Sequence, residues 1–196
     1  MSDPILQFEF PKIYSFPPFY TQQPNTTVLN QQLDSWVSII LHYCEYYRIT
    51  SLSIEGIPKH SQLEVPLSLL SSIFINKTIN RQVNSDFQKL IVKHLIHNKK
   101  AEFINPKKPE LGVYIYWRSL VDWGDLLYQY VDDTGQKGKV LTIYELTKSE
   151  ETTVPQDLHN LDETFLVKII KDYLIKQGKA QLLIDENNEI GGVKIV

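Results

Sequence analysis

The sequence predicts an α+β fold made of two tandem domains behind an extended leader. Three observations support this prediction. Prolines and aromatic residues concentrate in the first 25 of the 196 residues, apolar positions three or four apart mark several amphipathic helices, and one order of elements occurs twice. We expect a leader over residues 1–25, a first domain over 26–118 and a second domain over 119–196.

The leader carries five of the ten prolines of the chain. Proline fixes φ, lacks an amide proton and pushes the preceding residue toward extended conformations. We therefore expect residues 1–25 to be extended, without a helix. Large aromatic side chains lie between the prolines and offer contact area to a partner: Phe8, Phe10, Tyr14, Phe16, Phe19 and Tyr20.

The first domain is expected to begin with a long helix, because apolar side chains between Leu33 and Tyr47 recur on one helical face. Strand-forming residues over 49–54 predict a strand that ends at Gly56 and Pro58. The remaining elements are predicted as a short helix over 67–74, a helix over 83–95, and a hairpin of strands 101–104 and 113–117 around a turn at 105–109.

The second domain is expected to begin with a capped helix. Ser119 precedes an apolar face that runs from Leu120 to Val131, and Gly135 and Gly138 follow it. The remaining elements are predicted as a strand over 140–144, a polar loop over 148–153, a short turn or helix near 158–161, a helix over 162–174 capped by Asp162, and a closing hairpin of strands 180–184 and 192–196.

The first helices of the two domains can be aligned with each other at a constant spacing of 87 residues. The order of helix, strand, helix, helix and hairpin then recurs in both halves. A repeat of this supersecondary unit predicts two tandem winged-helix domains. The matched pairs are Leu33 with Leu120, Trp36 with Trp123, Ile40 with Leu127, and Tyr43 with Tyr130.

Composition excludes several classes of protein. Hydrophobic residues make up 42% and charged residues 22% of the chain, which is typical of a globular protein. No apolar run approaches the ~20 residues of a membrane span, and the N-terminus lacks the pattern of a secretory signal. Cys44 is the only cysteine, so an intrachain disulfide and a cysteine-based zinc site are ruled out. We therefore expect a chain of the cytosol or nucleus.

The net charge of −3 hides a basic and an acidic half. Residues 76–108 carry eight basic and two acidic side chains, whereas residues 122–163 carry ten acidic and three basic ones. The basic stretch allows an alternative function, a winged-helix nucleic-acid binder or a subunit of a transcription complex. Three arginines offer little base readout, and the second domain is acidic where such a binder would be basic. A solvated charged face is the favoured interpretation.

Metal-binding and phosphate-binding motifs fail on inspection. His94 and His97 have a spacing that a metal could use, but His94 lies on the apolar helix face and is expected in the core. The sequence around Gly138 lacks the first glycine and the Ser or Thr of a phosphate-binding loop. Residues 185–189 begin like a calcium loop, but Ile190 stands where glycine is needed, so a hairpin turn is predicted.

Catalytic residues are not predicted either. Asp132 and Asp133 are expected at a helix end rather than as a catalytic pair, and no nucleophile–base pair follows from spacing. We therefore expect no enzyme, and no catalytic, cofactor-binding or metal-binding residues.

Several stretches together carry a resemblance to a known family. They are Tyr14 to Thr21 followed by Gln23 to Asn25, Trp117 to Leu120, Leu141 to Leu146, and the turn Asp185 to Asn187 with Val193 and Lys194. With these, the chain resembles the vacuolar protein sorting-associated protein 25 family, the small subunit of the endosomal sorting complex ESCRT-II. The resemblance covers almost the whole chain and is weakest over residues 55–82.

The resemblance implies a non-enzymatic scaffold of two winged helices. Two copies would join one copy each of two larger subunits, vacuolar protein sorting proteins 22 and 36. The second domain would recruit the first ESCRT-III subunit, vacuolar protein sorting protein 20. Such a complex acts in ubiquitin-dependent sorting of membrane cargo into multivesicular endosomes, so the chain is expected in the cytoplasm, peripherally and indirectly on the endosomal membrane.

The resemblance also places the partner-binding residues in the leader. Residues 17–20 match the Pro-Pro-x-Tyr motif of the family, and residues 11–14 resemble a second copy in which Lys12 replaces the second proline. An already extended segment loses little conformational entropy when it docks. Two alternatives are that the leader packs on its own domain or that it binds a WW domain. The predicted partner-binding residues are Pro11, Tyr14, Phe16, Pro17, Pro18, Phe19 and Tyr20.

Partner contacts in the second domain are less readable from the sequence. Candidate surfaces are the exposed side of the helix over 162–177 and the closing hairpin over 180–196. The acidic loop over 148–163 could steer a basic partner helix. We expect charge reversal at Glu150, Glu151 and Asp157 to slow that association.

Overall fold

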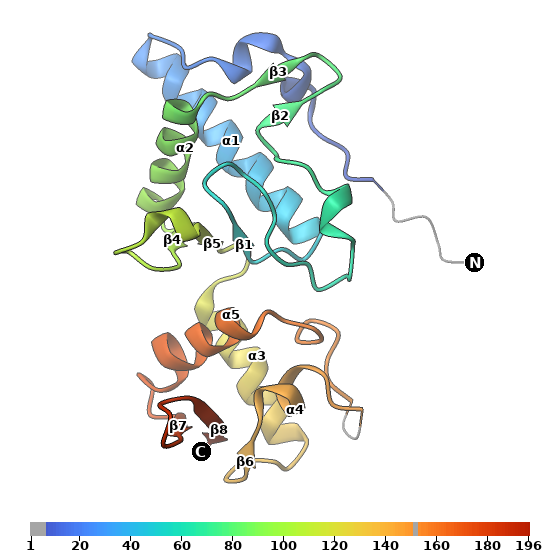
Figure 1. Ribbon diagram of the computed structural model, residues 1–196, viewed down its shortest axis with the longest axis vertical. Helices are drawn as coiled ribbons and strands as arrows, with labels where there is room; N and C mark the ends of the chain where they lie inside the picture. The colour runs from blue at the N-terminus through green and yellow to red at the C-terminus, as the bar shows by residue number, and fades with distance from the viewer. Residues whose placement is uncertain (1–6, 151–152) are drawn as a thin grey trace, which may run out of the picture. The chain divides into compact units, whose positions relative to one another are not determined.

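The computed structural model describes residues 7–150 and 153–196. Contacts divide the chain into two compact units, Met1–Trp117 and Arg118–Val196, each built of helices and a small antiparallel sheet (Figure 1). The predicted α+β class is confirmed.

The first unit is built around two long helices. Helix α1 (Thr26–Tyr46) begins after Asn25, whose side chain accepts a hydrogen bond from the amide of Val28 at 3.1 Å. Helix α2 (Ser85–His97) begins in the same way after Asn84. Asparagine at this position satisfies an amide that has no partner within the helix.

Short strands complete the first unit. A three-stranded antiparallel sheet has the order β1 (Ser51–Leu52), β5 (Val113–Ile115), β4 (Ala101–Phe103). A separate ribbon pairs β2 (Ile75–Asn76) with β3 (Arg81–Gln82), and the single turns η3 (Leu67–Leu69) and η4 (Pro109–Leu111) lie in the connections.

Several elements of the first unit are shorter than the sequence predicts, and two of them differ most. The strand expected over 49–54 ends at Leu52, because the amide of Ser53 bonds to the carbonyl of Ile57 and closes a turn in which Gly56 has φ +76°. The helix expected over 67–74 is only the single turn η3. Apolar residues at the end of that range belong to the core rather than to a helical face, since Phe74 is 1% exposed.

The leader is not simply extended, and the prediction that it contains no helix is wrong. It forms two 3₁₀ turns, η1 (Lys12–Ser15) and η2 (Pro17–Tyr20), separated by Phe16 in an extended conformation. Proline fits the start of a helical turn because its φ is suitable and its missing amide proton is not needed there. The prolines therefore lie at the starts of the two turns and do not prevent them.

The second unit repeats this plan with different details. Helix α3 (Leu120–Asp133) begins after Ser119, whose hydroxyl accepts from the amide of Asp122 at 3.0 Å, as predicted. Helix α5 (Glu163–Ile169) follows Asp162 and continues into the π-helical turn η5 (Ile170–Leu174). The sheet has the order β6 (Val140–Leu141), β8 (Ile190–Ile195), β7 (Ala180–Ile184) and is antiparallel.

The strand expected over 140–144 is too long by three residues. After Leu141, Thr142 caps a helix instead, α4 (Ile143–Thr147). The Thr142 hydroxyl accepts from the amide of Glu145, and the Glu145 carboxylate accepts from the amide of Thr142. This reciprocal pair is a capping box, and its sequence signal, Thr followed three residues later by Glu, was present but outweighed by the β-branched residues.

Gly124 sets the distance between α3 and η5. A Cβ atom at this position would lie 2.0 Å from the ring of Tyr173, so no larger residue fits without movement. Tyr173 lies over the glycine and donates a hydrogen bond from its hydroxyl to Asp125 at 2.8 Å. The two helices therefore meet through a bare backbone surface on one side and an aromatic ring on the other.

Candidate partner-binding surface

The two tyrosines of the leader lie in the core of the first unit. Tyr14 is 6% and Tyr20 is 2% exposed. The Tyr20 hydroxyl donates to the carbonyl of Tyr14 at 2.6 Å, and the Nδ2 of Asn76 donates to that carbonyl at 2.9 Å and to the Tyr20 hydroxyl at 3.2 Å. The Tyr14 hydroxyl donates in turn to the carbonyl of Ile73 at 2.9 Å. Both turns of the leader are thus tied to the segment around β2.

Helix α1 holds the leader from the other side. The ring of Phe19 stacks on Trp36 with centroids 4.3 Å apart and planes 9° from parallel. The Trp36 Nε1 donates to the carbonyl of Phe19 at 3.2 Å. The Gln32 Nε2 donates to the carbonyls of Phe19 and Thr21 at 3.0 and 2.8 Å. These contacts satisfy backbone carbonyls that would otherwise be buried without a partner.

Burial keeps both tyrosine hydroxyls neutral. It raises the pKa of Tyr14 above its ordinary value, and the neighbouring Tyr20 adds to the effect. It also raises the pKa of Tyr20, although the hydrogen bonds to Asn76 and Tyr14 work in the opposite direction. At neutral pH the hydroxyls therefore act as donors and acceptors within the unit.

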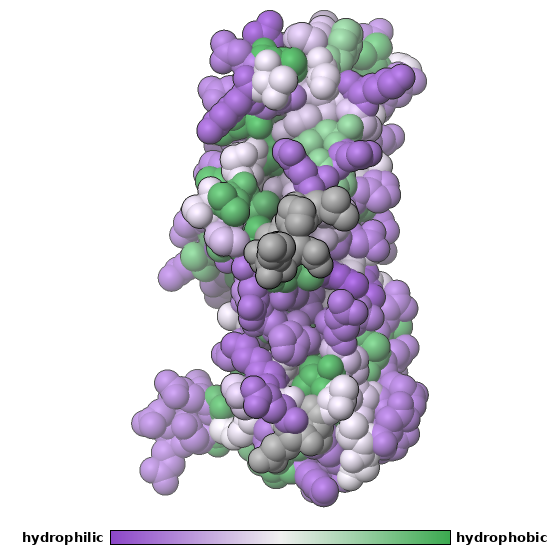
Figure 2. All heavy atoms as spheres, turned by 90° about the vertical axis from the view of Figure 1, so that its right-hand side faces the viewer, coloured by the Kyte–Doolittle hydropathy of each residue, from purple (hydrophilic) through white to green (hydrophobic). Residues whose placement is uncertain are grey.

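Four of the predicted residues of the leader face outward, whereas Phe19 is buried with the two tyrosines. Pro11, Phe16, Pro17 and Pro18 are exposed, and the Phe16 side chain reaches 57% exposure. The hydrophobic residues on the face drawn in Figure 2 appear as small groups among hydrophilic ones. Phe16 and Pro18 help to line a groove of about 420 Å³ together with Ile13, Phe19, Gln23, Val28, Gln31, Gln32 and Ser35.

The structure thus divides each copy of the leader motif between two sides. In residues 17–20 the two prolines face outward, and the last two residues face the core. In the degraded copy, Pro11 faces outward and Tyr14 inward. The alternative that the leader packs on its own domain therefore holds for Tyr14, Phe19 and Tyr20. The exposed side chains of the leader are the ones that a partner could contact.

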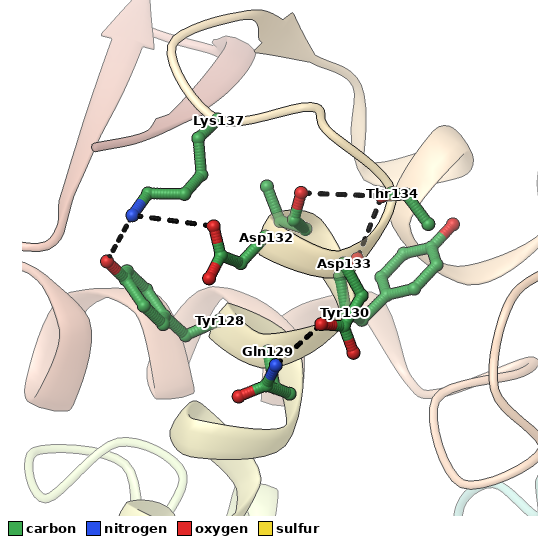
Figure 3. A network of polar contacts seen from close by, with 8 residues as sticks. Tyr128, Gln129, Tyr130, Asp132, Asp133, Thr134 and Lys137 are labelled. Atoms are coloured by element: carbon green, nitrogen blue, oxygen red, sulfur yellow. Dashed lines mark hydrogen bonds and ion pairs between the residues drawn. The ribbon is translucent and has the colours of Figure 1, made fainter.

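Two carboxylates at the end of α3 have partners within the second unit. At the end of α3, Lys137 donates to the Tyr128 hydroxyl at 2.6 Å and lies 3.7 Å from Asp132, while Gln129 donates to Asp133 at 2.7 Å (Figure 3). Asp132 and Asp133 therefore belong to a helix end, as predicted.

The acidic loop contains one carboxylate that is already engaged. Asp157 pairs with Arg118 at 3.5 Å, and the Arg118 guanidinium also lies 4.5 Å from the ring centre of Trp123. Glu151, one of the three residues predicted to steer a partner, lies outside the described residues.

Two of the candidate ion-binding residues, His94 and Asp185, make contacts within the chain. The prediction that His94 lies in the core is wrong: its side chain is 20% exposed, and its Nε2 lies 2.7 Å from the Oδ1 of Asp34, joining α2 to α1. Asp185 accepts from the amides of Asn187 and Glu189 and so closes the predicted hairpin turn. In the described part of the chain, no three His, Cys, Asp or Glu side chains are placed to hold a metal ion.

Comparison with known proteins gives the family. A family model described as "ESCRT-II complex subunit" matches residues 13–162. The vacuolar protein-sorting-associated protein 25 of Saccharomyces cerevisiae is 30% identical over 200 residues, which cover 95% of this chain and 98% of that protein. The protein of the same name from Dictyostelium discoideum is 33% identical and covers 92% and 93%. This chain belongs to the vacuolar protein sorting-associated protein 25 family of ESCRT-II subunits.

Solved structures of the family have the same fold. The crystal structure of subunit VPS25 of ESCRT-II matches with a TM-score of 0.81 at 31% identity, over 94% of this chain and 98% of that one. The crystal structure of the ESCRT-II complex of VPS22, VPS25 and VPS36 contains a chain that matches with a TM-score of 0.77 at 30% identity, over 95% and 98%. The family is one of structural subunits and not of enzymes. None of the described helices is both long and apolar enough to cross a membrane.

Three residues that hold the leader were not predicted from the sequence to do so. Trp36 was predicted only as part of a helical face, and Gln32 and Asn76 were not predicted as contacts. Asn76 lies 62 positions from Tyr14, and no local pattern links the two. Gln32 offers one signal, because its position in the sequence lies beside the apolar positions of the helix. The side chain is 6% exposed, and a buried polar side chain must find hydrogen-bond partners.

Proposed function

We propose that this chain is a non-enzymatic scaffold subunit of ESCRT-II. In this proposal the leader and the first domain dock on two larger subunits, vacuolar protein sorting proteins 22 and 36, and the second domain recruits the first ESCRT-III subunit, vacuolar protein sorting protein 20. Membership of the family supports the proposal, as does the similar chain in the solved complex of VPS22, VPS25 and VPS36. The complex would hold two copies of this subunit.

The cellular role follows from that assembly. We propose that the chain acts in ubiquitin-dependent sorting of membrane cargo into multivesicular endosomes, as a cytoplasmic protein held indirectly on the endosomal membrane. The similarity to solved subunits of the endosomal trafficking complex supports this role.

Both domains, over 26–118 and 119–196, are proposed to be winged helices. The second unit supports this most clearly, because α3, β6, α4, α5 and the β7–β8 hairpin follow one another in the order expected for that fold. In the first unit, the single turn η3 and the β2–β3 ribbon stand where the second unit has α4.

The outer side of the leader carries the proposal for docking. Pro11, Phe16, Pro17 and Pro18 are exposed on a segment whose backbone is fixed from behind by Tyr14, Tyr20 and helix α1. A segment that is ordered before it binds loses less entropy on binding, and a large exposed aromatic side chain such as Phe16 is a typical anchor. We therefore assign the partner contact to the outer side and the folding of the leader to the inner side.

The test is a pull-down of vacuolar protein sorting proteins 22 and 36 with the full chain. Phe16→Ala and Pro18→Ala should lower capture at least tenfold without lowering the unfolding midpoint, because neither side chain is buried. Leu69→Ala is a matched control, since Leu69 is 72% exposed elsewhere on the first unit. Unchanged capture by the double variant F16A/P18A contradicts the proposal.

Substitutions of the buried leader residues should affect the stability of the first unit as well as partner binding. Tyr20→Ala also changes a predicted partner-binding residue, but it does not test docking alone. Because Tyr20 is buried and hydrogen-bonded to two residues, this change should destabilise the first unit, so reduced capture by Y20A alone is not informative.

Steering by the acidic loop of the second domain is tested separately. Glu150→Lys is the cleaner reversal, because Asp157 already pairs with Arg118 and its reversal would also disturb the unit itself. The association rate with a basic partner helix should fall at low salt and become insensitive to the change at high salt. Equal rates at low salt argue against steering.

A further inference from the structure

Strand β7 (Ala180–Ile184) forms an unprotected edge of the sheet in the second unit. The sheet order β6-β8-β7 gives β7 one neighbour, and Figure 1 shows it at the margin of that sheet. Its side chains are apolar or uncharged, and Leu183 and Ile184 are 42% and 49% exposed. Natural sheets usually protect such an edge with a charge, a proline or a very short strand.

The hydrogen bonds at the two ends of β7 show which backbone groups face outward. The carbonyl of Lys179 accepts from the amide of Val196, and the amide of Asp185 donates to the carbonyl of Glu189, so both residues bond toward β8. In an antiparallel strand, the residues that bond to one side alternate with those that bond to the other. Ala180, Leu182 and Ile184 therefore direct their amides and carbonyls away from β8, to the open edge.

The charges that flank this edge complement each other about its centre. Lys179 comes three positions before Leu182, and Asp185 comes three positions after it. If a second copy pairs antiparallel with β7 about Leu182, Lys179 of each copy lies opposite Asp185 of the other. Leu182 then lies opposite itself and Ala180 opposite Ile184, and these are the residues whose backbone groups face outward.

We propose that the β7 edge binds a second copy of this chain, antiparallel and about a two-fold axis at Leu182. The pairing joins the two small sheets into one, satisfies the outward backbone groups and covers Ile184. A two-fold contact of this kind uses the same surface on both copies and is closed. The surface is separate from the leader, so the pairing goes beyond the proposed docking on the larger subunits.

Lys179 and Asp185 can make this contact while keeping their present ones. The Lys179 ammonium lies 4.7 Å from the ring centre of Tyr128 and has three donors, and the Oδ1 of Asp185 takes both turn amides while its carboxylate has a second oxygen. The hairpin contains a β-bulge, because Leu183 pairs with Gly192 and Ile184 pairs with Ile190. The extra residue lies on β8, so β7 itself has no bulge that would interrupt pairing along its outer edge.

Gln181 and Leu183 give the sharpest test of the pairing. They lie on the solvent face of β7 and would be opposite each other across the axis, in a close pair without backbone hydrogen bonds. The variants Q181K/L183K and Q181E/L183E place like charges opposite each other, whereas an equimolar mixture of the two places opposite charges together.

The measurement is sedimentation equilibrium of the full chain and its variants. The unmodified chain should show a monomer–dimer equilibrium. Each double variant should weaken dimerisation about tenfold or more while keeping its unfolding midpoint, and the mixture should restore it. Val140→Lys is the control, because Val140 is 54% exposed on the opposite edge strand, β6, and should leave dimerisation unchanged.

Three results overturn the proposal: a chain that stays monomeric, a mixture that fails to dimerise, or an equal loss with V140K. If the charged variants do not fold, disulfide formation between cysteine variants tests the same register. A mixture of Gln181→Cys and Leu183→Cys chains should form a disulfide faster than either chain alone. Cys44 will not interfere, because it is 0% exposed and burial raises the pKa of its thiol. Equal rates in the mixture and in the separate chains contradict the register.

Discussion

The two units use corresponding tryptophans in different ways. Trp36 on α1 and Trp123 on α3 occupy the same place in the repeat, and both are 0% exposed. In the first unit, the ring of Phe19 from the leader stacks on Trp36. In the second unit, the Arg118 guanidinium lies over Trp123, and Phe165 meets it edge-on with centroids 5.9 Å apart.

This difference indicates that the leader helps to bury Trp36 in the first unit. The second unit buries its tryptophan with residues of its own repeat and the residue just before it, whereas the first unit needs a segment from outside the repeat. The leader is therefore part of the first fold, and the outer surface proposed to bind partners depends on that fold.

Phe19→Ala should have the largest effect. It removes a ring that is 2% exposed and stacked on Trp36, so the first unit should lose about 3–5 kcal/mol of its free energy of unfolding. Chemical denaturation followed by tryptophan fluorescence measures this loss. A loss below about 1 kcal/mol, the typical size for a surface change, shows that the leader does not close the core.

Alkaline pH should have the next largest effect, on the first unit. Burial raises the pKa of Tyr14, Tyr20 and Tyr43 above the ordinary value of 10.0, all in the first unit. A raised pKa in the folded state means that stability is complete below pH 10 and falls as pH rises above it, by up to about 1.4 kcal/mol per pH unit for each group. Unfolding followed at several pH values should show a slope that Tyr14→Phe reduces. The idea fails if Y14F leaves the slope as it was.

Gly124→Ala should affect the second unit by about 1–3 kcal/mol. The new Cβ atom would stand 2.0 Å from the Tyr173 ring, so α3 and η5 must move apart. Thermal unfolding measures the loss, and Tyr173→Ser in the same chain should recover part of it by making room. If the double variant is no more stable than G124A, the close approach of the two helices is not the cause.

Tyr20→Phe should cost the first unit about 1–2 kcal/mol. The change keeps the ring and removes a hydroxyl that donates to Tyr14 and accepts from Asn76. Tyr144→Phe is the matched control, because Tyr144 is 59% exposed and should change stability by less than about 0.5 kcal/mol. Equal losses of stability in the two variants would show that the hydrogen bonds of the Tyr20 hydroxyl do not stabilise the first unit.

Arg118→Gln should have the smallest effect, about 0.5–1.5 kcal/mol in the second unit. It removes the cation over Trp123 and the ion pair with Asp157 but leaves the apolar core intact. Denaturation of this variant beside F19A compares the two ways of covering a tryptophan. A loss as large as that of F19A contradicts the view that only the first unit depends on an outside segment.

Local patterns predicted the helices well, because their signals lie in adjacent residues. Ser119 and Asp162 each cap a helix at the expected start, and most of the apolar residues that the spacing places on the faces of α1, α2, α3 and α5 are buried. The failures occurred where two local signals compete. The β-branched residues Val140, Thr142 and Ile143 favoured a strand, while the pair Thr142 and Glu145 starts a helix.

The leader could be predicted only in part for a different reason. Its prolines and aromatic residues mark it as a contact segment, but nothing local separates Pro18, which faces outward, from Phe19, which faces inward. That separation is made by Trp36 and Gln32 on α1 and by Asn76 near β2. Contacts over such distances in sequence follow from the tertiary fold and not from spacing.

The most direct test of the account is hydrogen exchange of the leader in the full chain without partners. The amides of Tyr14, Phe16, Phe19 and Thr21 bond to carbonyls within the two turns, at 2.9 to 3.2 Å. These four amides should be protected from exchange, and Phe19→Ala should remove the protection, while Phe16→Ala should not. Exchange of these amides at the rate of an unstructured peptide in the unmodified chain would contradict a leader that is folded on its own unit before it meets a partner.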